Sequence, residues 1–125
     1  EFLSTNCEFP PAASIIGYKE QMVVVGSFHS SSKVVLNHVN AGNSGPAVIC
    51  IHSLLDSWRT FSRLLPTLPA HAQVYALDLR GHGKSSKVVY DPSNPRMNPY
   101  TMEANVQDIL GFMKTKGISS ASFIG

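Results

Sequence analysis

Residues 74–85 read VYALDLRGHGKS, an apolar run that leads directly into a glycine-rich turn. Because strands of a parallel sheet are covered on both faces, a largely apolar run such as Val74–Leu79, in which Asp78 is the one charged residue, predicts a buried strand. Gly81 and Gly83 predict a sharp change of chain direction after it. Residues 81–99 contain Gly, Ser, Asp, Asn and three Pro, so we expect a long loop there.

Four other runs on either side of this stretch are expected to be strands. Residues 21–28 and 33–39 are rich in β-branched residues and flank a polar stretch, a pattern typical of an antiparallel hairpin. Ala47–Ile51 and Ser120–Ile124 are short apolar runs like Val74–Leu79. Since these strands alternate with helical segments, the sequence predicts an α/β fold: a mainly parallel sheet, with the hairpin as its antiparallel edge, flanked by helices.

Two segments are expected to form helices. Residues 57–65 have apolar side chains at helical spacing, with Asp56 or Ser57 as the N-cap and Pro66 as the stop. A second helix begins after the N-cap Thr101, runs to about Lys116 and ends at Gly117. The expected buried positions are Trp58, Phe61, Leu64 and Leu65 in the first helix, and Met102, Val106, Ile109, Leu110 and Met113 in the second.

The composition excludes several classes of protein. The chain has 125 residues, of which 43% are hydrophobic and 14% charged, enough for one folded domain and too apolar for a disordered tail. The formal net charge is only +2 and no basic cluster occurs, so nucleic-acid binding is not expected. The longest apolar run, Ala47–Ile51, is far shorter than the roughly 20 residues that a membrane-spanning helix needs.

Two familiar kinds of site do not fit the residues present. Residues 81–85 (GHGKS) end like a phosphate-binding loop, but Asp78 stands where that motif needs its first glycine, and its charge would repel phosphate. None of the five histidines has a partner three or four residues away, and the two cysteines do not form a C-x-x-C pair. No nucleotide, metal or other cofactor is therefore expected, and Cys50 is interpreted as a small buried apolar side chain.

The chain divides into an irregular leader, residues 1–20, and one part of a domain, residues 21–125. Residues 1–2 read Glu-Phe, which a common restriction site also encodes, so we expect a cloning scar there. Because the last strand stops on Gly125 and domains seldom end in mid-strand, we expect the native polypeptide to continue. The missing initial Met and the scar slightly favour secretion over a cytoplasmic location, and the sequence leaves open whether Cys7 is disulfide-bonded.

Residues 52–58 (HSLLDSW) follow the strand Ala47–Ile51 and lead into the first helix. In α/β sheets, ligands bind beyond the carboxyl ends of the strands, and a backbone N–H there can point at a developing oxyanion. A plain turn between a strand and a helix has the same appearance. Spacing alone leaves both interpretations open.

In combination, residues 46–52, 56–58 and 74–85 resemble the N-terminal half of an α/β-hydrolase. Residues 100–125 resemble the helix and strand that precede the nucleophile in that family, so the resemblance covers about residues 33–125. It implies that Gly125 is the first glycine of the nucleophile elbow G-x-S-x-G and that the nucleophile lies two residues further on. The chain would then contain none of the catalytic triad.

The resemblance also implies half of an oxyanion hole. The backbone N–H of Leu54 would be one donor, and the hydroxyl of Ser53, which stands where the family has glycine, is a candidate for another. The substrate pocket is expected to comprise His52, Ser53, Leu54 and Leu55. A structural loop held by hydrogen bonds is expected from Asp78, Arg80, Gly81, Gly83 and Ser85.

On this basis we expect a serine hydrolase that acts on a small carboxylic ester or lactone. Leu55 occupies the place where epoxide hydrolases and haloalkane dehalogenases of this fold have proline, so an enzyme of that kind, with an Asp nucleophile, is the alternative. A non-catalytic binding protein that kept the fold is the other alternative. The implied partners are a small-molecule ester or lactone and the missing C-terminal half of the fold, in the same or a separate chain. Residues 1–125 alone are expected to aggregate or to need a partner chain that carries the other half, because half a sheet leaves apolar faces exposed.

Overall fold

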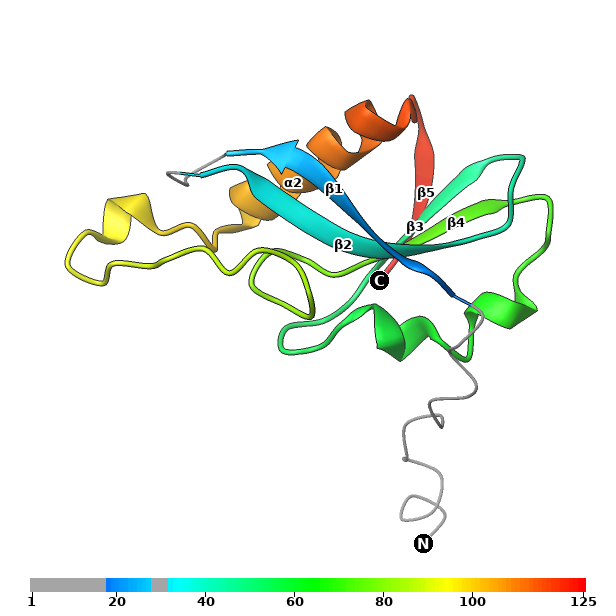
Figure 1. The fold of residues 1–125 in the computed structure, drawn as a ribbon, viewed down its shortest axis with the longest axis horizontal. Helices are drawn as coiled ribbons and strands as arrows, with labels where there is room; N and C mark the ends of the chain where they lie inside the picture. Colours follow the sequence, from blue (N-terminus) through cyan, green and yellow to red (C-terminus); the bar gives the residue numbers. More distant parts are fainter. Residues whose placement is uncertain (1–17, 28–31) are drawn as a thin grey trace, which may run out of the picture.

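The computed structural model describes residues 18–27 and 32–125, and a five-stranded mixed sheet forms its centre (Figure 1). The sheet order is β1-β2-β4-β3-β5; β1 and β4 both pair antiparallel with β2, whereas β4, β3 and β5 run parallel. The predicted α/β fold with an antiparallel hairpin at the edge is therefore confirmed. The strands are β1 (Glu20–Gly26), β2 (Val34–Ala41), β3 (Ala47–Ile51), β4 (Gln73–Leu77) and β5 (Ala121–Ile124).

Several expectations concern residues outside the described part of the chain. The proposed cloning scar, Cys7 and the rest of residues 1–17 lie outside it, as do residues 28–31 of the hairpin connection. β1 begins one residue earlier than expected and ends at Gly26, two residues before the expected end. Gly26 has a φ of 136° and follows an irregularity in the β1–β2 register, a backbone path that glycine accepts and other residues rarely adopt.

The prediction of an α-helix at residues 57–65 is wrong. The structure has two short 3-10 helices there, η2 (Trp58–Phe61) and η3 (Leu65–Thr67). Backbone hydrogen bonds in this region join each donor to the third residue before it. Pro66 has no N–H for the longer bond of an α-helix, and it lies inside η3 rather than ending a helix. Ser57 is the N-cap of η2, as one of the two predicted alternatives.

β4 ends at Leu77, two residues before the end predicted for this strand. The N–H of Asp78 donates to the carbonyl of Asn37 (2.8 Å), and the N–H of Leu79 donates to the side chain of His52 (3.0 Å). At Leu79 the backbone N–H therefore bonds to a side chain instead of to a neighbouring strand. The chain leaves the sheet at Asp78, the first residue of the glycine-rich loop.

The second predicted helix is present as α2 (Met102–Lys116), and both of its predicted caps are confirmed. The hydroxyl of Thr101 accepts a hydrogen bond from the N–H of Ala104 (3.1 Å). Gly117 adopts a left-handed φ of 70° and closes the last turn. The N-terminal end of α2 follows the long loop, in which the only helix is the short 3-10 helix η4 (Pro95–Met97).

The face that α2 turns toward the sheet is only partly the one predicted. Ala104, Asp108 and Phe112, spaced by four, are its buried residues, with Ile109 and Met113 packed at their edge. The side chains that are exposed, contrary to the prediction, are Met102, Val106 and Leu110. Apolar spacing indicated the wrong stripe because one of the buried positions is a charged residue, Asp108.

Two apolar layers enclose the sheet. In Figure 1, α2 lies over one face, and η2 and η3 lie on the other. The α2 face is lined by Val23, Val34, Leu36, Ile49, Tyr75, Leu77 and Phe112, and the opposite face by Val39, Cys50, Trp58, Leu65, Ala72, Val74 and Ala76. The predicted core positions of Trp58 and Cys50 are confirmed, and burial raises the pKa of the Cys50 thiol to about 11.

Gly111 sets how closely α2 approaches β1. A Cβ at this position would overlap the backbone carbonyl of Val25, so Gly111→Ala must push the helix away from the strand. Alanine favours a helix by about 1 kcal/mol over glycine, yet we expect the variant to lose about 1–3 kcal/mol of unfolding free energy from the overlap. Equilibrium urea unfolding measures this loss. Gln107→Ala, on the exposed side of the same helix, is the control, and a Gly111→Ala protein at least as stable as the parent would contradict the prediction.

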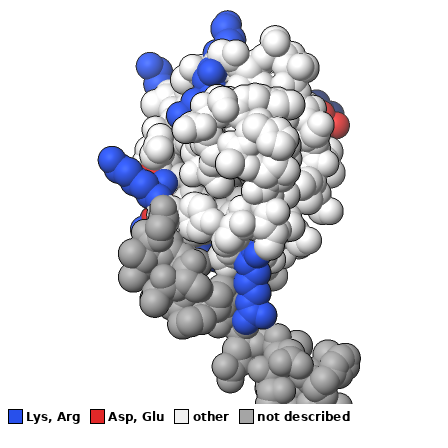
Figure 2. Space-filling view, turned by 90° about the vertical axis from the view of Figure 1, so that its right-hand side faces the viewer, with Lys and Arg blue, Asp and Glu red and all other residues white. Residues whose placement is uncertain are grey.

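Charged side chains do not gather on the face shown in Figure 2, which is the right-hand side of Figure 1. Lys and Arg side chains lie at its margins, around a centre without charge. Across residues 18–27 and 32–125, no helix has the length and apolar content to cross a membrane. The same residues contain no group of three or more His, Cys, Asp or Glu side chains that could hold a metal ion.

Candidate functional site

The carboxyl ends of β3, β4 and β5 meet at one edge of the sheet. His52 follows β3, Asp78 follows β4 and Gly125 follows β5. Gly125 lies beside the end of β3, since a Cβ built on it would be 3.6 Å from the carbonyl oxygen of Ile51. Because parallel sheets bind ligands beyond these strand ends, this edge is the candidate site.

His52 connects two of these strand ends. Its Nε2 accepts a hydrogen bond from the N–H of Leu79 (3.0 Å), a group that can only donate. Nδ1 lies 2.7 Å from the carbonyl oxygen of Ser53 and must therefore hold the ring proton and donate it. The buried, neutral imidazole thus ties the loop after β3 to the loop after β4.

Residues 53–56 form a tight turn, closed by the N–H of Asp56 donating to the carbonyl of Ser53 (3.2 Å). Leu55 has a φ of 65°, in the left-handed region that favours glycine. The side chains of Leu54 and Leu55 are 80% and 89% exposed. Within the described part of the chain, no group accepts a hydrogen bond from the N–H of Leu54. This N–H is therefore available to a ligand.

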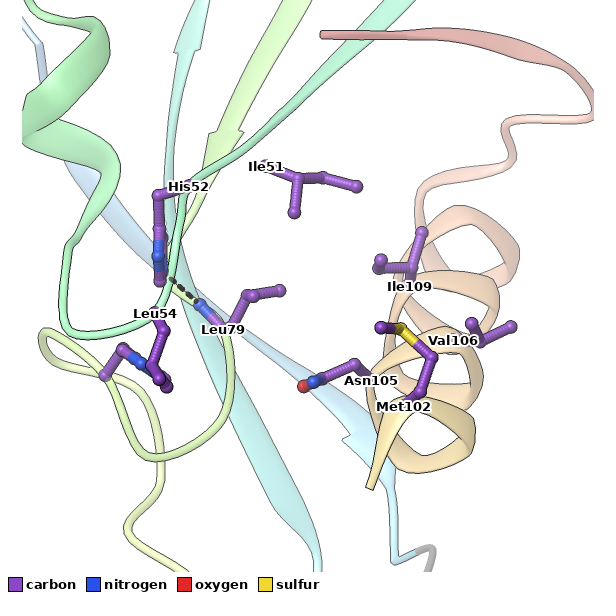
Figure 3. A pocket seen from close by; sticks show the side chains of 9 residues that line it. Ile51, His52, Leu54, Leu79, Met102, Asn105, Val106 and Ile109 are labelled. Atoms are coloured by element: carbon purple, nitrogen blue, oxygen red, sulfur yellow. Dashed lines mark hydrogen bonds between the residues drawn. The ribbon is translucent and has the colours of Figure 1, made fainter. Parts of the chain in front are cut away.

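A cavity of about 340 Å³ lies between this turn and α2 (Figure 3). His52 and Leu54 line it, whereas Ser53 and Leu55, which the sequence also assigns to the pocket, do not. The side chain of Asn105 points from α2 into the cavity in Figure 3, and its Oδ1 has no hydrogen-bond partner among the described residues. The other lining residues are Ile51, Leu79, His82, Met102, Val106 and Ile109. Such an apolar hollow with a few polar groups is typical of a small-molecule pocket.

Asp78 organises the loop that follows β4. Its buried carboxylate accepts three hydrogen bonds: from the Trp58 N–H (2.7 Å), the Asn37 side-chain amide (2.8 Å) and the Lys84 N–H (3.0 Å). Gly83 has a φ of 50°, and a Cβ there would overlap this carboxylate. The loop therefore folds around the side chain of its own first residue.

Ser85 and Gly81 fix the loop to its surroundings. The Ser85 hydroxyl donates to the carbonyl of Asp78 (2.6 Å) and accepts from the N–H of Asn37 (2.8 Å). Gly81 has a φ of 77°, and a Cβ on it would lie 2.5 Å from the ring of Tyr100. These contacts join the loop to β2 and to the segment that precedes α2.

Arg80 joins the same loop to α2 through a buried ion pair. Its Nε and Nη2 donate to the two carboxylate oxygens of Asp108, both at 2.6 Å. Its Nη1 donates to the carbonyl of Pro99 (2.7 Å). A two-pronged bond of this kind fixes orientation as well as distance.

Sequence reasoning missed four polar residues at this edge: Asn37, His82, Asn105 and Asp108. Asn37 and Asp108 contact residues 41 and 28 positions away, and no local pattern indicates such pairs. His82 drew attention only as part of the glycine-rich turn. A signal for Asp108 exists, because it stands four residues from both Ala104 and Phe112 on one helix face.

Comparisons with known proteins agree with the fold of the sheet. The family model described as alpha/beta hydrolase fold matches residues 46–125. Bifunctional epoxide hydrolase 2 of Rattus norvegicus is 31% identical over 122 residues, which is 97% of this chain and 21% of that protein. A serine hydrolase-like protein of Homo sapiens is 40% identical over 65 residues, which is 52% of this chain and 29% of that protein. The chain thus spans less than a third of either relative.

A solved structure shares the fold. The epoxide hydrolase from an endophytic Streptomyces superposes with a TM-score of 0.69 at 27% identity, over 88% of this chain and 30% of that one. The arrangement of the sheet and α2 therefore matches part of a larger enzyme.

Proposed function

Because this chain belongs to the α/β-hydrolase family, we propose that it supplies one oxyanion donor, the backbone N–H of Leu54, to a serine hydrolase whose nucleophile lies beyond Gly125. The proposed substrate is a small carboxylic ester or lactone. A small-molecule substrate is what the hydrolase family implies, and the cavity beside Leu54 has a volume suited to one.

The backbone at Leu55 is the observation that carries the choice of serine. Epoxide hydrolases and haloalkane dehalogenases of this fold have proline at the corresponding place, and the proline ring holds φ near −65°. Leu55 has a φ of 65°. A loop with proline there could not follow this path, which supports an enzyme of a different kind.

In the proposed reaction the serine oxygen attacks the acyl carbon of the ester, and the carbonyl oxygen becomes negatively charged. The N–H of Leu54 would donate a hydrogen bond to that oxygen, with the hydroxyl of Ser53 as a second candidate donor. Collapse of this intermediate expels the alcohol, and water then releases the acid from the serine. Histidine and carboxylate groups of the triad would come from the other half of the fold.

An uncovered apolar surface supports the proposal that another half exists, in the same or a separate chain. Among the described strands, β5 pairs only with β3, and Phe123 on β5 is 52% exposed. Beside Phe123, side chains of α2 line an apolar groove of about 200 Å³. We propose that the C-terminal half of the fold covers this groove. The residues of α2 that line it are Val106, Ile109, Leu110 and Met113.

The test uses the full-length protein that contains this chain. We expect it to hydrolyse short-chain nitrophenyl esters or small lactones and to be labelled by a fluorophosphonate. Peptide mapping should locate the label on a serine two residues after Gly125, and changing that serine to alanine should abolish both labelling and turnover. A protein inert toward a broad panel of esters and lactones would overturn the proposal.

An epoxide hydrolase is the second candidate, favoured by the relatives from Rattus norvegicus and Streptomyces. In that case the residue two positions after Gly125 would be aspartate, as it would be in a dehalogenase. Epoxide turnover without ester turnover, and no fluorophosphonate label, would favour this candidate over the first.

A further inference from the structure

We propose that His82 is a positioning residue that holds the turn carrying the candidate oxyanion donor, Leu54. The inference rests on the proposed function, in which the N–H of Leu54 meets the oxyanion. The N–H of Leu55 donates to Nε2 of His82 at 3.0 Å, although the two residues are 27 positions apart. This bond fixes the plane of the peptide that follows Leu54, because a peptide unit is planar.

The peptide that precedes Leu54 is fixed by other partners. The carbonyl of Ser53 accepts from Nδ1 of His52 (2.7 Å) and from the N–H of Asp56 (3.2 Å). In a trans peptide the N–H points away from the C=O, so these two bonds direct the N–H of Leu54 to the opposite side. His52 and His82 therefore hold the two peptides on either side of Leu54.

The protonation of His82 follows from its neighbours. Nε2 must be unprotonated to accept from the N–H of Leu55, and Nδ1 lies 2.9 Å from the carbonyl oxygen of Arg80. Nδ1 therefore holds the proton and donates it. The rings of His52 and His82 lie 4.9 Å apart at an angle of 54°, so the two holding groups also support each other.

The backbone conformation of Leu55 explains why the bond to His82 is needed. A leucine with a φ of 65° is strained and persists only where its surroundings hold it. A proline-containing turn would be stiff by itself, and a proline has no N–H to donate. Here the turn has no proline, and the bond to His82 supplies the restraint from outside. Loss of that restraint would let the Leu54–Leu55 peptide rotate and misplace the neighbouring donor.

The first experiment reads the bond directly. In full-length protein labelled with ¹⁵N in histidine and leucine, we expect His82 in the Nδ1-protonated form and a scalar coupling across the bond from Leu55 N–H to His82 Nε2. A ring protonated at Nε2 would overturn the proposal. This readout does not depend on activity, so loss of the bond can be distinguished from failure of the proposed function, which the ester panel tests.

The second experiment separates positioning from packing. His82→Ala is expected to lower kcat for an ester about 10- to 100-fold, with KM changed by about twofold or less, because only the transition state uses the oriented donor. His82→Gln places an oxygen near the position of Nε2 and should recover most of kcat. The matched control His71→Ala, at an exposed histidine, should leave both constants unchanged. Folded Ala and Gln variants with equal losses, or an Ala variant with normal kcat, would overturn the proposal.

Discussion

Arg80→Met is expected to lower the free energy of unfolding by about 3–5 kcal/mol, because it leaves the buried carboxylate of Asp108 without its partner. The side chains of Arg80 and Asp108 are 0% and 3% exposed, so water cannot replace the lost hydrogen bonds. The carbonyl of Pro99 loses a donor in the same variant. Urea unfolding of the full-length protein at neutral pH measures the effect as a lower midpoint at an unchanged slope.

Two further variants show whether the buried charge is the cause. Arg96→Met makes the same substitution at an exposed position in η4 and should change the unfolding free energy by less than about 0.5 kcal/mol. Adding Asp108→Leu to Arg80→Met removes both charges and should recover part of the loss. A loss below about 1 kcal/mol in Arg80→Met would show that water reaches the site, contrary to the structure.

The ion pair also bears on the candidate site. The carbonyl of Arg80 accepts a hydrogen bond from Nδ1 of His82. Arg80, which Asp108 holds in place, therefore orients the histidine. A protein that survives Arg80→Met should therefore have a less well-oriented His82. This connects the stability of the loop after β4 to the geometry of the turn at Leu54.

The parts of the fold predicted correctly depend on residues close together in sequence. The buried strands are recognisable as short apolar runs, and Thr101 and Gly117 cap α2 through hydrogen bonds within one turn. Pro66 illustrates the limit of such rules, because proline fits the first turn of a helix as well as the position after its end, and here it lies in the first turn of η3. The start of η2 also depends on Asp78, which accepts a hydrogen bond from the N–H of Trp58, twenty positions away.

The candidate site was less predictable, because its geometry depends on contacts between separate loops. The family resemblance indicated Leu54 as a donor, and that assignment stays a prediction. Nothing local indicated that Leu55 adopts a left-handed φ or that His82 binds its N–H. The interpretation of the glycine-rich loop as purely structural omits His82, whose side chain accepts a hydrogen bond from the turn at Leu55. Long-range polar pairs of this kind leave no periodic signal in a single sequence.

Acid is expected to destabilise the protein through His38, a histidine in β2 that is fully buried beneath α2. Its ring packs edge-on against Phe112 at 4.9 Å, and neither ring nitrogen has a hydrogen-bond partner among the described residues. Burial, aided by the charge of Lys116 and opposed by a backbone interaction with Gln21, lowers the pKa of His38 from 6.5 to about 4. The folded protein therefore resists a proton that the unfolded chain accepts readily.

The sign of the effect follows from this difference. A pKa lower in the folded state means that the contribution of His38 is complete above about pH 6.5 and is lost as the pH falls toward 4. The loss over this range is at most about 3 kcal/mol. His38→Met removes the titrating group and both unpaired nitrogens, so unfolding free energy should depend less steeply on pH in this window, with stability at pH 7 equal or higher. His71→Met, at an exposed histidine, should keep the parent slope. Identical slopes for His38→Met and the parent protein would contradict the prediction, because they would mean that the folded protein protonates His38 beneath α2 as readily as the unfolded chain does.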